Sequence, residues 1–363
     1  MTSDLPSRPL AIPARMPDHS RSPVVLFWEI TRACALVCRH CRAEAQPQRH
    51  PLELTTNECF RAVDEICRFS PKPILVISGG DPLMRRDLFE VAAYATSLGL
   101  RTSLSPSVTA LVTPRNLTRV YQAGVRHISF SLDGATPEVH DSFRGVQGSY
   151  TRTLWALGAA QDAGLTVQIN TTVSRWNKAQ LEEMADIVGR SGAVLWDLFF
   201  LVPTGRARRE EMLSAEEHEH LFHWLYDLSL RTTFRVKTTL GQQFRRVTVQ
   251  RARQDGRQVD GVPSTNDGKG ICFISHIGDI YPSGFLPVRC GNVRTHSLVE
   301  VYQTHPLLLA LRDPGQLKGK CGVCPFNSVC GGCRARAYAC TGDYLAAEPC
   351  CLFAPSAAQS EEP

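Results

Sequence analysis

The sequence predicts an α/β protein: a curved parallel sheet covered by helices, followed by a small cysteine-rich α+β domain. Three observations lead to this fold class. Apolar segments of strand length alternate with helical segments six times between residues 24 and 229. No clear hairpin signal interrupts the alternation, and nine of the fourteen cysteines follow residue 269. Six βα units in series favour a barrel that does not close completely.

The six predicted strands have the length and composition of buried strands, with many β-branched and aromatic residues. Strands separated by single helices are typical of βαβ units, in which neighbouring strands run parallel. The predicted strands cover residues 24–30, 74–78, 101–105, 127–132, 166–173 and 194–201.

Capping residues mark the ends of the predicted helices. Thr55 and Glu58 form a capping box, whose two side chains satisfy free backbone donors, so the first helix begins there. Ser214 and Glu217 form a second capping box, which begins a helix that reaches about residue 229. Between them, glycines in the left-handed conformation are expected to end the first three of four helices. The four helices cover residues 88–98, 114–123, 150–163 and 177–191, and the glycines are Gly99, Gly124 and Gly164.

The folded part of the chain is expected to have two domains between two polar ends. Residues 1–22 and 354–363 are predicted to be disordered. Residues 23–240 are predicted to form a partial (β/α)6 TIM-like barrel. Residues 241–269 are polar and contain glycine and proline, as a linker does, and residues 270–353 form the cysteine-rich domain.

The composition excludes several classes of protein. With 43% hydrophobic and 21% charged residues among 363, the chain is globular rather than disordered, collagen-like or coiled-coil. Its net charge of +5 is scattered without a basic block, so we expect no nucleic-acid partner. The sequence shows no signal peptide and no apolar stretch of about 18 residues, so we expect no membrane contact and a cytoplasmic protein. Thiols stay reduced in the cytoplasm, which favours metal or redox chemistry for the cysteines.

Three cysteines, Cys34, Cys38 and Cys41, lie close together directly after the first strand, where the rim of a barrel carries its active site. Thiolate ligands select zinc or iron–sulfur clusters. On a [4Fe-4S] cluster, three cysteines leave the fourth iron free to bind a substrate or cofactor. The alternatives are a zinc site that lacks its fourth ligand and three buried structural thiols.

A second group of cysteines lies near the C-terminal end, with glycines between its members. Its density predicts a cluster-binding or zinc-ribbon site. Cys59 and Cys67 fall within the first helix instead and are expected to be core residues. The group consists of Cys321, Cys324, Cys330, Cys333, Cys340, Cys350 and Cys351.

The turn SGGDP (78–82) follows the second strand and suits the binding of a small ligand. Gly79 and Gly80 have no side chains, so a ligand can approach the backbone closely. Asp81 supplies a negative partner for an ammonium group, and Pro82 stiffens the turn. A plain strand-to-helix turn would look the same. Likewise, Asp133 in SLDG (131–134) could cap a turn.

The segment FWEITRACALVCRHC resembles the signature of the radical S-adenosylmethionine (SAM) superfamily, and other motifs of that superfamily follow in order at successive strand ends. The resemblance implies a [4Fe-4S] cluster on Cys34, Cys38 and Cys41 and a bound SAM. Further implied SAM contacts are the methionine ammonium at Gly79, Gly80, Asp81 and Pro82, the ribose at Ser131 and Asp133, and additional contacts at Asn170 and VPTGRA (202–207).

The C-terminal run CGVCPFNSVCGGCRARAYACTGDYLAAEPCC resembles the SPASM/twitch extension of radical SAM enzymes, in its haem-modifying version. That resemblance implies one auxiliary [4Fe-4S] cluster. Its implied ligands are Cys321, Cys324, Cys330 and Cys351, while Cys333, Cys340 and Cys350 are surplus. Cys272 and Cys290 stand near further ligand positions of two-cluster relatives, but their spacing departs from that pattern.

The family resemblance implies an oxidoreductase or lyase that reductively cleaves SAM to a 5′-deoxyadenosyl radical, which abstracts hydrogen from a substrate. The implied substrate is a porphyrin or haem precursor, which undergoes oxidative decarboxylation or side-chain removal. A flavodoxin or ferredoxin is expected to supply electrons. Arg206, Arg208 and Arg209 are candidates to bind substrate carboxylates, although Glu210 and Glu211 could instead pair with them at a solvated surface.

Two alternatives remain open at this point. The first is a SPASM maturase of a ribosomally made peptide, although residues 1–22 are short for a leader-recognition domain. The second is a non-catalytic zinc-binding scaffold. His220 and His223 share a helix face near His218, but no third ligand is in register, so we expect surface or packing roles for them.

Overall fold

The computed structural model describes residues 18–257 and 264–355 of the chain. Most of the two predicted disordered ends and residues 258–263 of the predicted linker lie outside the described residues. Residues 18–22, the described end of the N-terminal segment that was predicted to be disordered, pack against the folded protein. The Tyr302 hydroxyl donates a hydrogen bond to the His19 carbonyl at 2.9 Å, and Gln303 donates to the Arg21 carbonyl at 2.9 Å.

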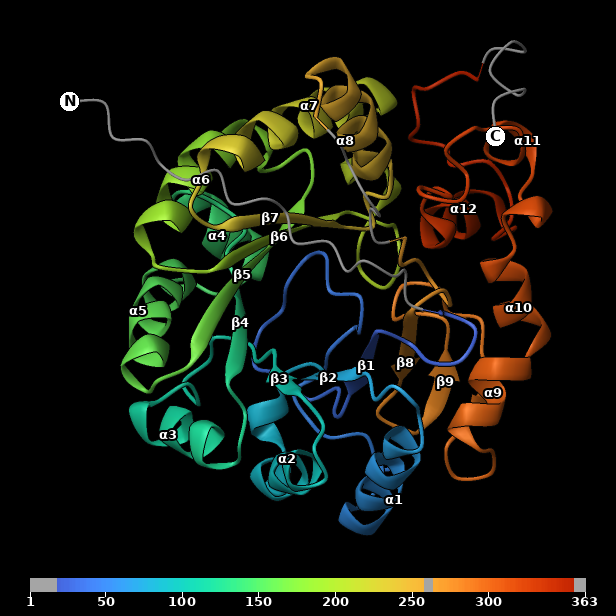
Figure 1. Ribbon diagram of the computed structural model, residues 1–363. Coiled ribbons are helices and arrows are strands. Elements are labelled where there is room, and N and C mark those ends of the chain that lie inside the picture. Colours follow the sequence, from blue (N-terminus) through green and yellow to red (C-terminus); the bar gives the residue numbers. More distant parts are fainter. Residues whose placement is uncertain (1–17, 258–263, 356–363) are drawn as a thin grey trace.

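One ten-stranded sheet forms the centre of the molecule, in the order β10-β9-β8-β1-β2-β3-β4-β5-β6-β7 (Figure 1). All pairs from β8 to β7 are parallel, whereas β9 pairs antiparallel with both β8 and β10. The strands are β1 (Val25–Glu29), β2 (Ile74–Ser78), β3 (Thr102–Leu104), β4 (His127–Ser131), β5 (Thr166–Val173), β6 (Leu195–Phe200), β7 (Arg235–Thr239), β8 (Ile271–Ile274), β9 (Asp279–Tyr281) and β10 (Gly291–Asn292).

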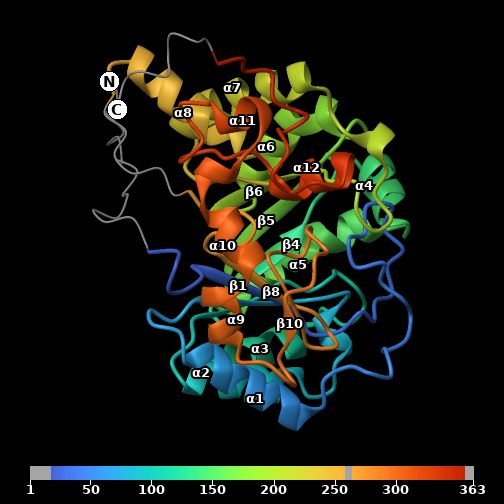
Figure 2. The same ribbon diagram turned by 90° about the vertical axis from the view of Figure 1, so that its right-hand side faces the viewer.

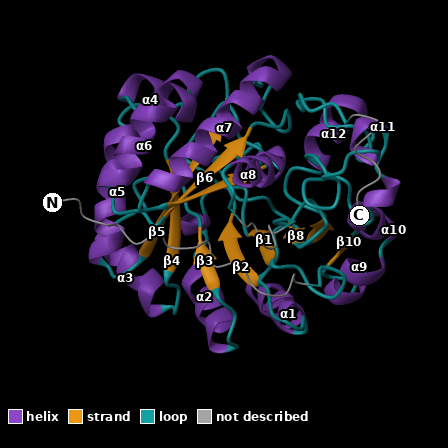
Figure 3. Ribbon diagram, turned by 45° about the horizontal axis from the view of Figure 1, so that its top comes forward, coloured by secondary structure: helices purple, strands orange, loops and turns teal. Residues whose placement is uncertain are grey.

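Helices cover the outer face of the curved parallel sheet, and the strands lie inside the ring that these helices form (Figure 3). Helices α9 and α10 lie instead beside β8 to β10 (Figure 2). The helices are α1 (Thr56–Cys67), α2 (Leu88–Ser97), α3 (Pro114–Gln122), α4 (Pro137–Arg144), α5 (Ser149–Asp162), α6 (Leu181–Arg190), α7 (Ala215–Arg231), α8 (Gln243–Gln254), α9 (Leu298–Thr304), α10 (Pro306–Arg312), α11 (Gly319–Gly322) and α12 (Arg334–Thr341).

The predicted partial barrel and its six strands are confirmed, and so are both capping boxes, at the starts of α1 and α7. Gly99, Gly124 and Gly164 have φ angles of 79°, 87° and 81°, so each glycine follows its helix in the left-handed conformation as predicted. The sheet also contains a seventh parallel strand in the barrel, β7. Strand β7 was not predicted, because RVKTT carries charged and hydroxyl side chains where a buried strand would be apolar.

The first part of the predicted linker is helical. Helix α8 packs against α7, and the ion pairs Arg246–Glu219 and Arg251–Asp227 join the two helices. The helical pattern of apolar residues in α8 was not visible in the sequence, because arginines and other polar side chains also fill the face that contacts α7. The predicted boundary between the two domains, near residue 240, does not interrupt the sheet, because β8 of the C-terminal part pairs with β1 of the barrel.

The two faces of the parallel sheet differ in chemistry, and β5 shows the difference. Val167, Ile169 and Val173 are buried against the helices, whereas Gln168 and Asn170 are partly exposed on the inner face. Polar side chains therefore line part of the inside of the barrel, which is an open cavity rather than the packed interior of a closed barrel. No helix in the described residues has both the length and the apolar character that a membrane crossing requires.

Candidate cluster and cofactor site

A cavity of about 3110 Å³ runs through the inside of the partial barrel. Of the predicted site residues, the three cysteines of the first group and Gly79, Gly80, Ser131 and Asn170 line it. Asp81, Pro82 and Asp133 are not among its lining residues. The structure therefore brings most of the predicted site together, and it places the two carboxylates behind the cavity wall.

Backbone pairing fixes the loop that carries Cys34. The Cys34 N–H donates to the Gln46 carbonyl at 2.8 Å, and the Asp81 N–H donates to the Ala33 carbonyl at 2.7 Å. A Cβ atom on Gly80 would lie 2.4 Å from the Ala33 oxygen. The glycine pair of SGGDP thus allows the cysteine loop itself to approach β2, a requirement that the sequence analysis assigned to a ligand.

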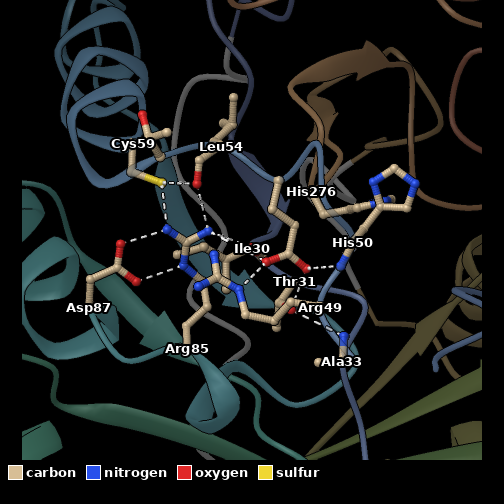
Figure 4. Close-up of polar contacts among 12 residues, drawn as sticks. Ile30, Thr31, Ala33, Arg49, His50, Leu54, Cys59, Arg85, Asp87 and His276 are labelled. Atoms are coloured by element: carbon tan, nitrogen blue, oxygen red, sulfur yellow. Dashed lines mark hydrogen bonds and ion pairs between the residues drawn. The ribbon is translucent and has the colours of Figure 1, made fainter. Parts of the chain in front are cut away.

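Buried polar groups support the cysteine loop from behind (Figure 4). Glu53 accepts hydrogen bonds from the Thr31 hydroxyl at 2.6 Å and from the Arg32 N–H at 3.2 Å. Arg85, which is fully buried, donates to the Ile30 carbonyl at 3.2 Å and pairs with Asp87. The path of the chain from β1 to Cys34 is therefore fixed by charged groups that a sequence motif does not contain.

A second set of contacts ties the cysteine loop to the C-terminal part. Arg42, which follows Cys41, donates to one oxygen of Glu29 at 2.9 Å, and the other oxygen of Glu29 lies 2.8 Å from His276 Nδ1. The Arg42 guanidinium lies 4.8 Å from the centre of the Phe273 ring on β8. A cation over an aromatic face is attracted by the ring quadrupole, so these contacts hold the loop against β8.

The sulfur atoms of the three cysteines lie among hydrogen-bond donors. The Leu36 N–H is 3.3 Å from Cys34 Sγ, the Ala45 N–H is 3.4 Å from Cys41 Sγ, and a guanidinium nitrogen of Arg144 is 3.7 Å from Cys38 Sγ. Burial raises the pKa of the Cys34 and Cys38 thiols, so their thiolates need a positive group such as a metal.

These donors suit an iron–sulfur cluster, whose sulfurs accept hydrogen bonds of this kind. No three His, Cys, Asp or Glu side chains within residues 18–257 and 264–355 are close enough together to bind a single metal ion. In a cluster each cysteine binds a different iron atom, so the cluster spans the space between the sulfurs.

The two carboxylates of the predicted SAM site have protein partners. Asp81 accepts from the Thr109 hydroxyl at 2.7 Å and from the Leu83 N–H at 3.1 Å, and burial raises the pKa of Asp81 to about 6. Asp133 lies 2.5 Å from Arg144 and accepts from the Thr172 N–H at 2.7 Å. Both carboxylates are fully buried, so in this structure they position other groups of the site.

Arg144 and Ser107 were not predicted from the sequence. Ser107 lines the cavity, its oxygen lies 3.4 Å from Cys34 Sγ, and its hydroxyl donates to the Gly80 carbonyl at 2.8 Å. Arg144 ends helix α4, and the sequence analysis did not predict that helix. Pro137 at its first turn and Gly145 after its last residue are the signals that could have revealed it.

The arginines predicted to bind carboxylates are not among the residues that line the cavity. Arg208 is 73% exposed at its side chain and lies 3.9 Å from Glu210, which agrees with the solvated-surface alternative. Arg206 contacts the cysteine loop instead, because its backbone N–H donates to the Cys41 carbonyl at 3.1 Å. His223 lies 3.5 Å from Glu219 at the surface of α7, and His218 is buried.

The structure separates the C-terminal cysteines into two sets. The four predicted ligands of the auxiliary cluster line one small cavity, together with Arg246 and Lys320. Cys333 is fully buried and accepts a hydrogen bond from the Arg336 N–H, and Cys340 and Cys350 pack around Leu201. Cys272 and Cys290 belong to the main hydrophobic core. The four predicted ligands are Cys321, Cys324, Cys330 and Cys351.

Comparisons with known proteins agree with this geometry. The profile of the Radical SAM superfamily matches residues 28–188. An AdoMet-dependent heme synthase of Methanosarcina barkeri is 40% identical over 344 residues, which are 93% of this chain and 98% of that protein. The chain is a member of the radical SAM superfamily.

More distant members of the superfamily also match. A mycofactocin maturase MftC of Mycobacterium tuberculosis is 33% identical over 86% of this chain and 79% of its own. The crystal structure of Streptococcus suis SuiB bound to S-adenosylmethionine superposes with a TM-score of 0.71 and 15% identity, over 92% of this chain and 78% of that one. SuiB therefore shares the fold of this radical SAM protein.

The family assignment confirms three predictions made from the sequence. The protein is a radical SAM enzyme with a C-terminal SPASM/twitch region, and it uses a [4Fe-4S] cluster and SAM together with an auxiliary cluster. The alternative of a non-catalytic zinc scaffold is wrong, because the full-length relatives are enzymes.

Proposed function

We propose that this radical SAM enzyme acts on a tetrapyrrole that carries several carboxylates, a porphyrin or haem precursor, by oxidative decarboxylation or side-chain removal. The observation that carries the proposal is the charge of the barrel cavity. Its described lining residues include nine arginines and lysines but only two acidic residues, Asp197 and Asp267, and both of these are buried. The basic residues are Arg42, Arg101, Arg126, Arg144, Arg231, Arg235, Lys237, Arg245 and Arg257.

Size and charge both support a large anionic substrate. Arginine and lysine form strong, charge-assisted hydrogen bonds with carboxylates. The cavity of about 3110 Å³ exceeds the range of about 300–1,000 Å³ that is usual for a site with a single small ligand. It therefore has room for SAM and a macrocycle together. The name of the Methanosarcina barkeri relative, a heme synthase, agrees with this substrate class.

In this proposal Cys34, Cys38 and Cys41 hold the cluster that binds SAM, and Ser131 and Asn170 contact the cofactor from the cavity wall. When bound, cluster and cofactor supply a 5′-deoxyadenosyl radical that removes hydrogen from the substrate. The protein holds both molecules in place and keeps other hydrogen donors out. The remaining predicted contacts act indirectly, since Asp81, Pro82 and Asp133 stand behind the lining residues.

The auxiliary cluster belongs to the same proposal. Its ligands would be Cys321, Cys324, Cys330 and Cys351. The cluster would accept the electron that the substrate radical gives up after hydrogen abstraction. A flavodoxin or ferredoxin would supply the electron that SAM cleavage consumes. None of the fourteen cysteines forms a disulfide in the structure. Reduced thiols suit the cytoplasmic location that we propose for the enzyme.

A peptide substrate is the second candidate. The mycofactocin maturase relative supports it, because it is 33% identical over most of this chain. In this case the basic cavity would bind an acidic peptide.

The test begins with anaerobic reconstitution and measurement of iron and labile sulfide. The enzyme is then incubated with SAM, dithionite and a porphyrin tetracarboxylate, and the products are analysed by mass spectrometry. We expect 5′-deoxyadenosine together with a porphyrin that has lost carbon dioxide or a side chain. Alanine in place of Cys34, Cys38 and Cys41 should abolish both products. Formation of 5′-deoxyadenosine with unchanged porphyrin, and modification of an acidic peptide instead, would overturn the tetrapyrrole proposal.

A further inference from the structure

The edge strand β7 carries two cations that line the cavity. Arg235 and Lys237 are two residues apart on this strand, so their side chains leave the same face about 7 Å apart. Lys237 is 51% exposed at its side chain, and Arg235 is exposed and forms no ion pair with any described residue. Two cations with room around them thus face the cavity from one strand.

The sheet register places Lys237 in line with the proposed cofactor contacts. Ser131 pairs with Asn170, Asn170 pairs with Asp197, and Asp197 pairs with Lys237, across four neighbouring strands. All four residues line the cavity. A group bound at Lys237 therefore lies at the same level of the barrel as a cofactor at Ser131 and Asn170.

A buried carboxylate fixes the lysine ammonium. Asp197 is 1% exposed, and its Oδ2 accepts from Lys237 Nζ at 2.6 Å. The Thr239 hydroxyl donates to Asp197 Oδ1 at 2.9 Å and so holds the carboxylate in place. An ammonium group has three donors, and this ion pair uses one of them. The others are available to an anion in the cavity.

Edge strands often carry charges for a different reason, which is to prevent pairing with another molecule. That role needs a charge in solvent and does not need a buried partner. Burying a carboxylate such as Asp197 is costly unless it is paired, so the structure maintains a specific position for the lysine. A fixed ammonium at the level of the cofactor is what recognition of a substrate carboxylate requires.

We propose that Lys237 and Arg235 bind a carboxylate of the substrate and thereby determine which side chain of it reaches the cofactor. Asp197 and Thr239 are positioning residues that act through Lys237. The inference rests on the proposed function, and it assigns the recognition of the carboxylate to β7 among the nine cations of the cavity.

The test measures ligand binding to the anaerobically reconstituted enzyme by absorbance titration in the porphyrin band. The probes are a porphyrin tetracarboxylate and its tetramethyl ester, which has the same ring without the charges. Lys237→Met and Arg235→Met should each weaken binding of the tetracarboxylate at least tenfold and leave the ester unaffected. Lys178→Met is the control, because Lys178 also pairs with a carboxylate, Glu217, and is 40% exposed, but lies outside the cavity lining.

Turnover separates positioning from binding. Asp197→Asn should raise KM for the tetracarboxylate with little change in kcat, and Lys237→Arg should keep most of the affinity because it keeps the charge. Cleavage of SAM without substrate should be unchanged in the control Lys178→Met.

Three further results would overturn the inference in different ways. If Lys237→Met and Arg235→Met bind and convert the tetracarboxylate as the unmodified enzyme does, β7 has no role in recognition, while the proposed function stands. If the unmodified enzyme binds ester and acid equally, or binds neither, the proposed substrate class is wrong, and the inference is wrong with it. Aggregation of the variants with loss of both probes would show that the charges protect the edge of the sheet.

Discussion

The guanidinium of Arg144 lies between a carboxylate and a thiol. One nitrogen is 2.5 Å from Asp133, and another is 3.7 Å from Cys38 Sγ. A positive donor next to a cluster ligand favours the reduced form of the cluster, which carries one more electron. Arg144 therefore connects the SLDG segment to the redox properties of the proposed cluster.

We expect Arg144→Met to lower the reduction potential of the SAM-binding cluster. Loss of a charge-assisted hydrogen bond of about 1.5 kcal/mol corresponds to a shift on the order of 60 mV for one electron. A redox titration followed by electron paramagnetic resonance measures the shift, with the exposed Arg115→Met as the control. An unchanged potential in Arg144→Met would show that the guanidinium does not interact with the cluster.

The buried Asp81 carboxyl should make the folding stability of the protein depend on pH. Burial raises its pKa from 3.8 to about 6, so the folded protein binds this proton more tightly than the unfolded chain does. The contribution of the protonated Asp81 carboxyl to folding stability is complete below about pH 4 and is lost as the pH rises through about 6. Relative to Asp81→Asn, the unmodified protein should therefore lose up to about 3 kcal/mol of stability over this range.

Urea unfolding under anaerobic conditions at several pH values measures this difference. Asp162→Asn, at an exposed carboxylate, should show no such trend. Binding of SAM at pH 7.5 should change little in Asp81→Asn. A large loss of SAM affinity would instead support the contact with the cofactor ammonium that the family resemblance implies.

Sequence motifs locate the residues of the site that are contiguous in the chain. The three cysteines, SGGDP and SLDG were found because each lies directly after a recognisable strand. Arg144 and Lys237 could not be found in this way. Arg144 meets Cys38 across 106 residues of sequence, and Lys237 acquires its role only when β7 aligns with β6. Contacts of this kind depend on tertiary structure.

At the scale of elements, the contact between the end of β2 and the cysteine loop depends on two glycines. A Cβ atom on Gly80 would lie 2.4 Å from the Ala33 oxygen and 2.6 Å from the Arg32 oxygen, and backbone atoms cannot move aside cheaply. The hydrogen bonds from Gly80 N–H to Thr31 and from Asp81 N–H to Ala33 would then be lost.

We therefore expect Gly80→Ala to displace the cysteine loop and to reduce the iron content at that site by more than half. Iron analysis of a variant that also lacks the four auxiliary cysteines isolates the first cluster. Gly158→Ala is the control, because a Cβ there meets nothing within 4 Å. It should keep its iron and gain about 0.5–1 kcal/mol of stability, as alanine does in a helix. Full iron content in Gly80→Ala would contradict the close approach seen here.

Apolar strands and capped helices were predictable because they carry strong local signals. Strand β7 and helix α8 were not, and the reason is the same for both. Their inward or interhelical faces carry arginine, lysine and threonine, so neither element shows an apolar period. The local sequence pattern therefore does not reveal an element whose polar face borders a cavity or packs through ion pairs.

At the scale of the whole molecule, Arg336 joins the C-terminal part to the barrel. Its guanidinium is fully buried, pairs with Glu348 at 3.2 Å, and donates to the Phe200 carbonyl at 3.2 Å and the Leu240 carbonyl at 2.8 Å. Helix α12 is thereby held to the ends of β6 and β7. Such contacts favour unfolding of both parts in one step.

We expect Arg336→Met to destabilise the whole protein by about 3–5 kcal/mol, because it leaves Glu348 buried without its partner. Denaturation of the cluster-loaded protein, followed by tryptophan fluorescence and by cluster absorbance, should give one coincident transition that shifts as a unit. The exposed Arg253→Met is the control and should leave the transition unchanged. Separate transitions for the two signals would show that the C-terminal part unfolds on its own.

Strand β1 is hydrogen-bonded to β2 on one side and to β8 on the other, and the first cysteine loop continues directly from it. Segments from opposite ends of the chain thus meet at the strand that leads to the proposed SAM-binding cluster. A chimera that takes its C-terminal half from another superfamily member would give β1 a foreign neighbour. Recombination between relatives should therefore succeed only when the crossover keeps β1 and β8 from the same parent, so that the two halves are inherited as one unit.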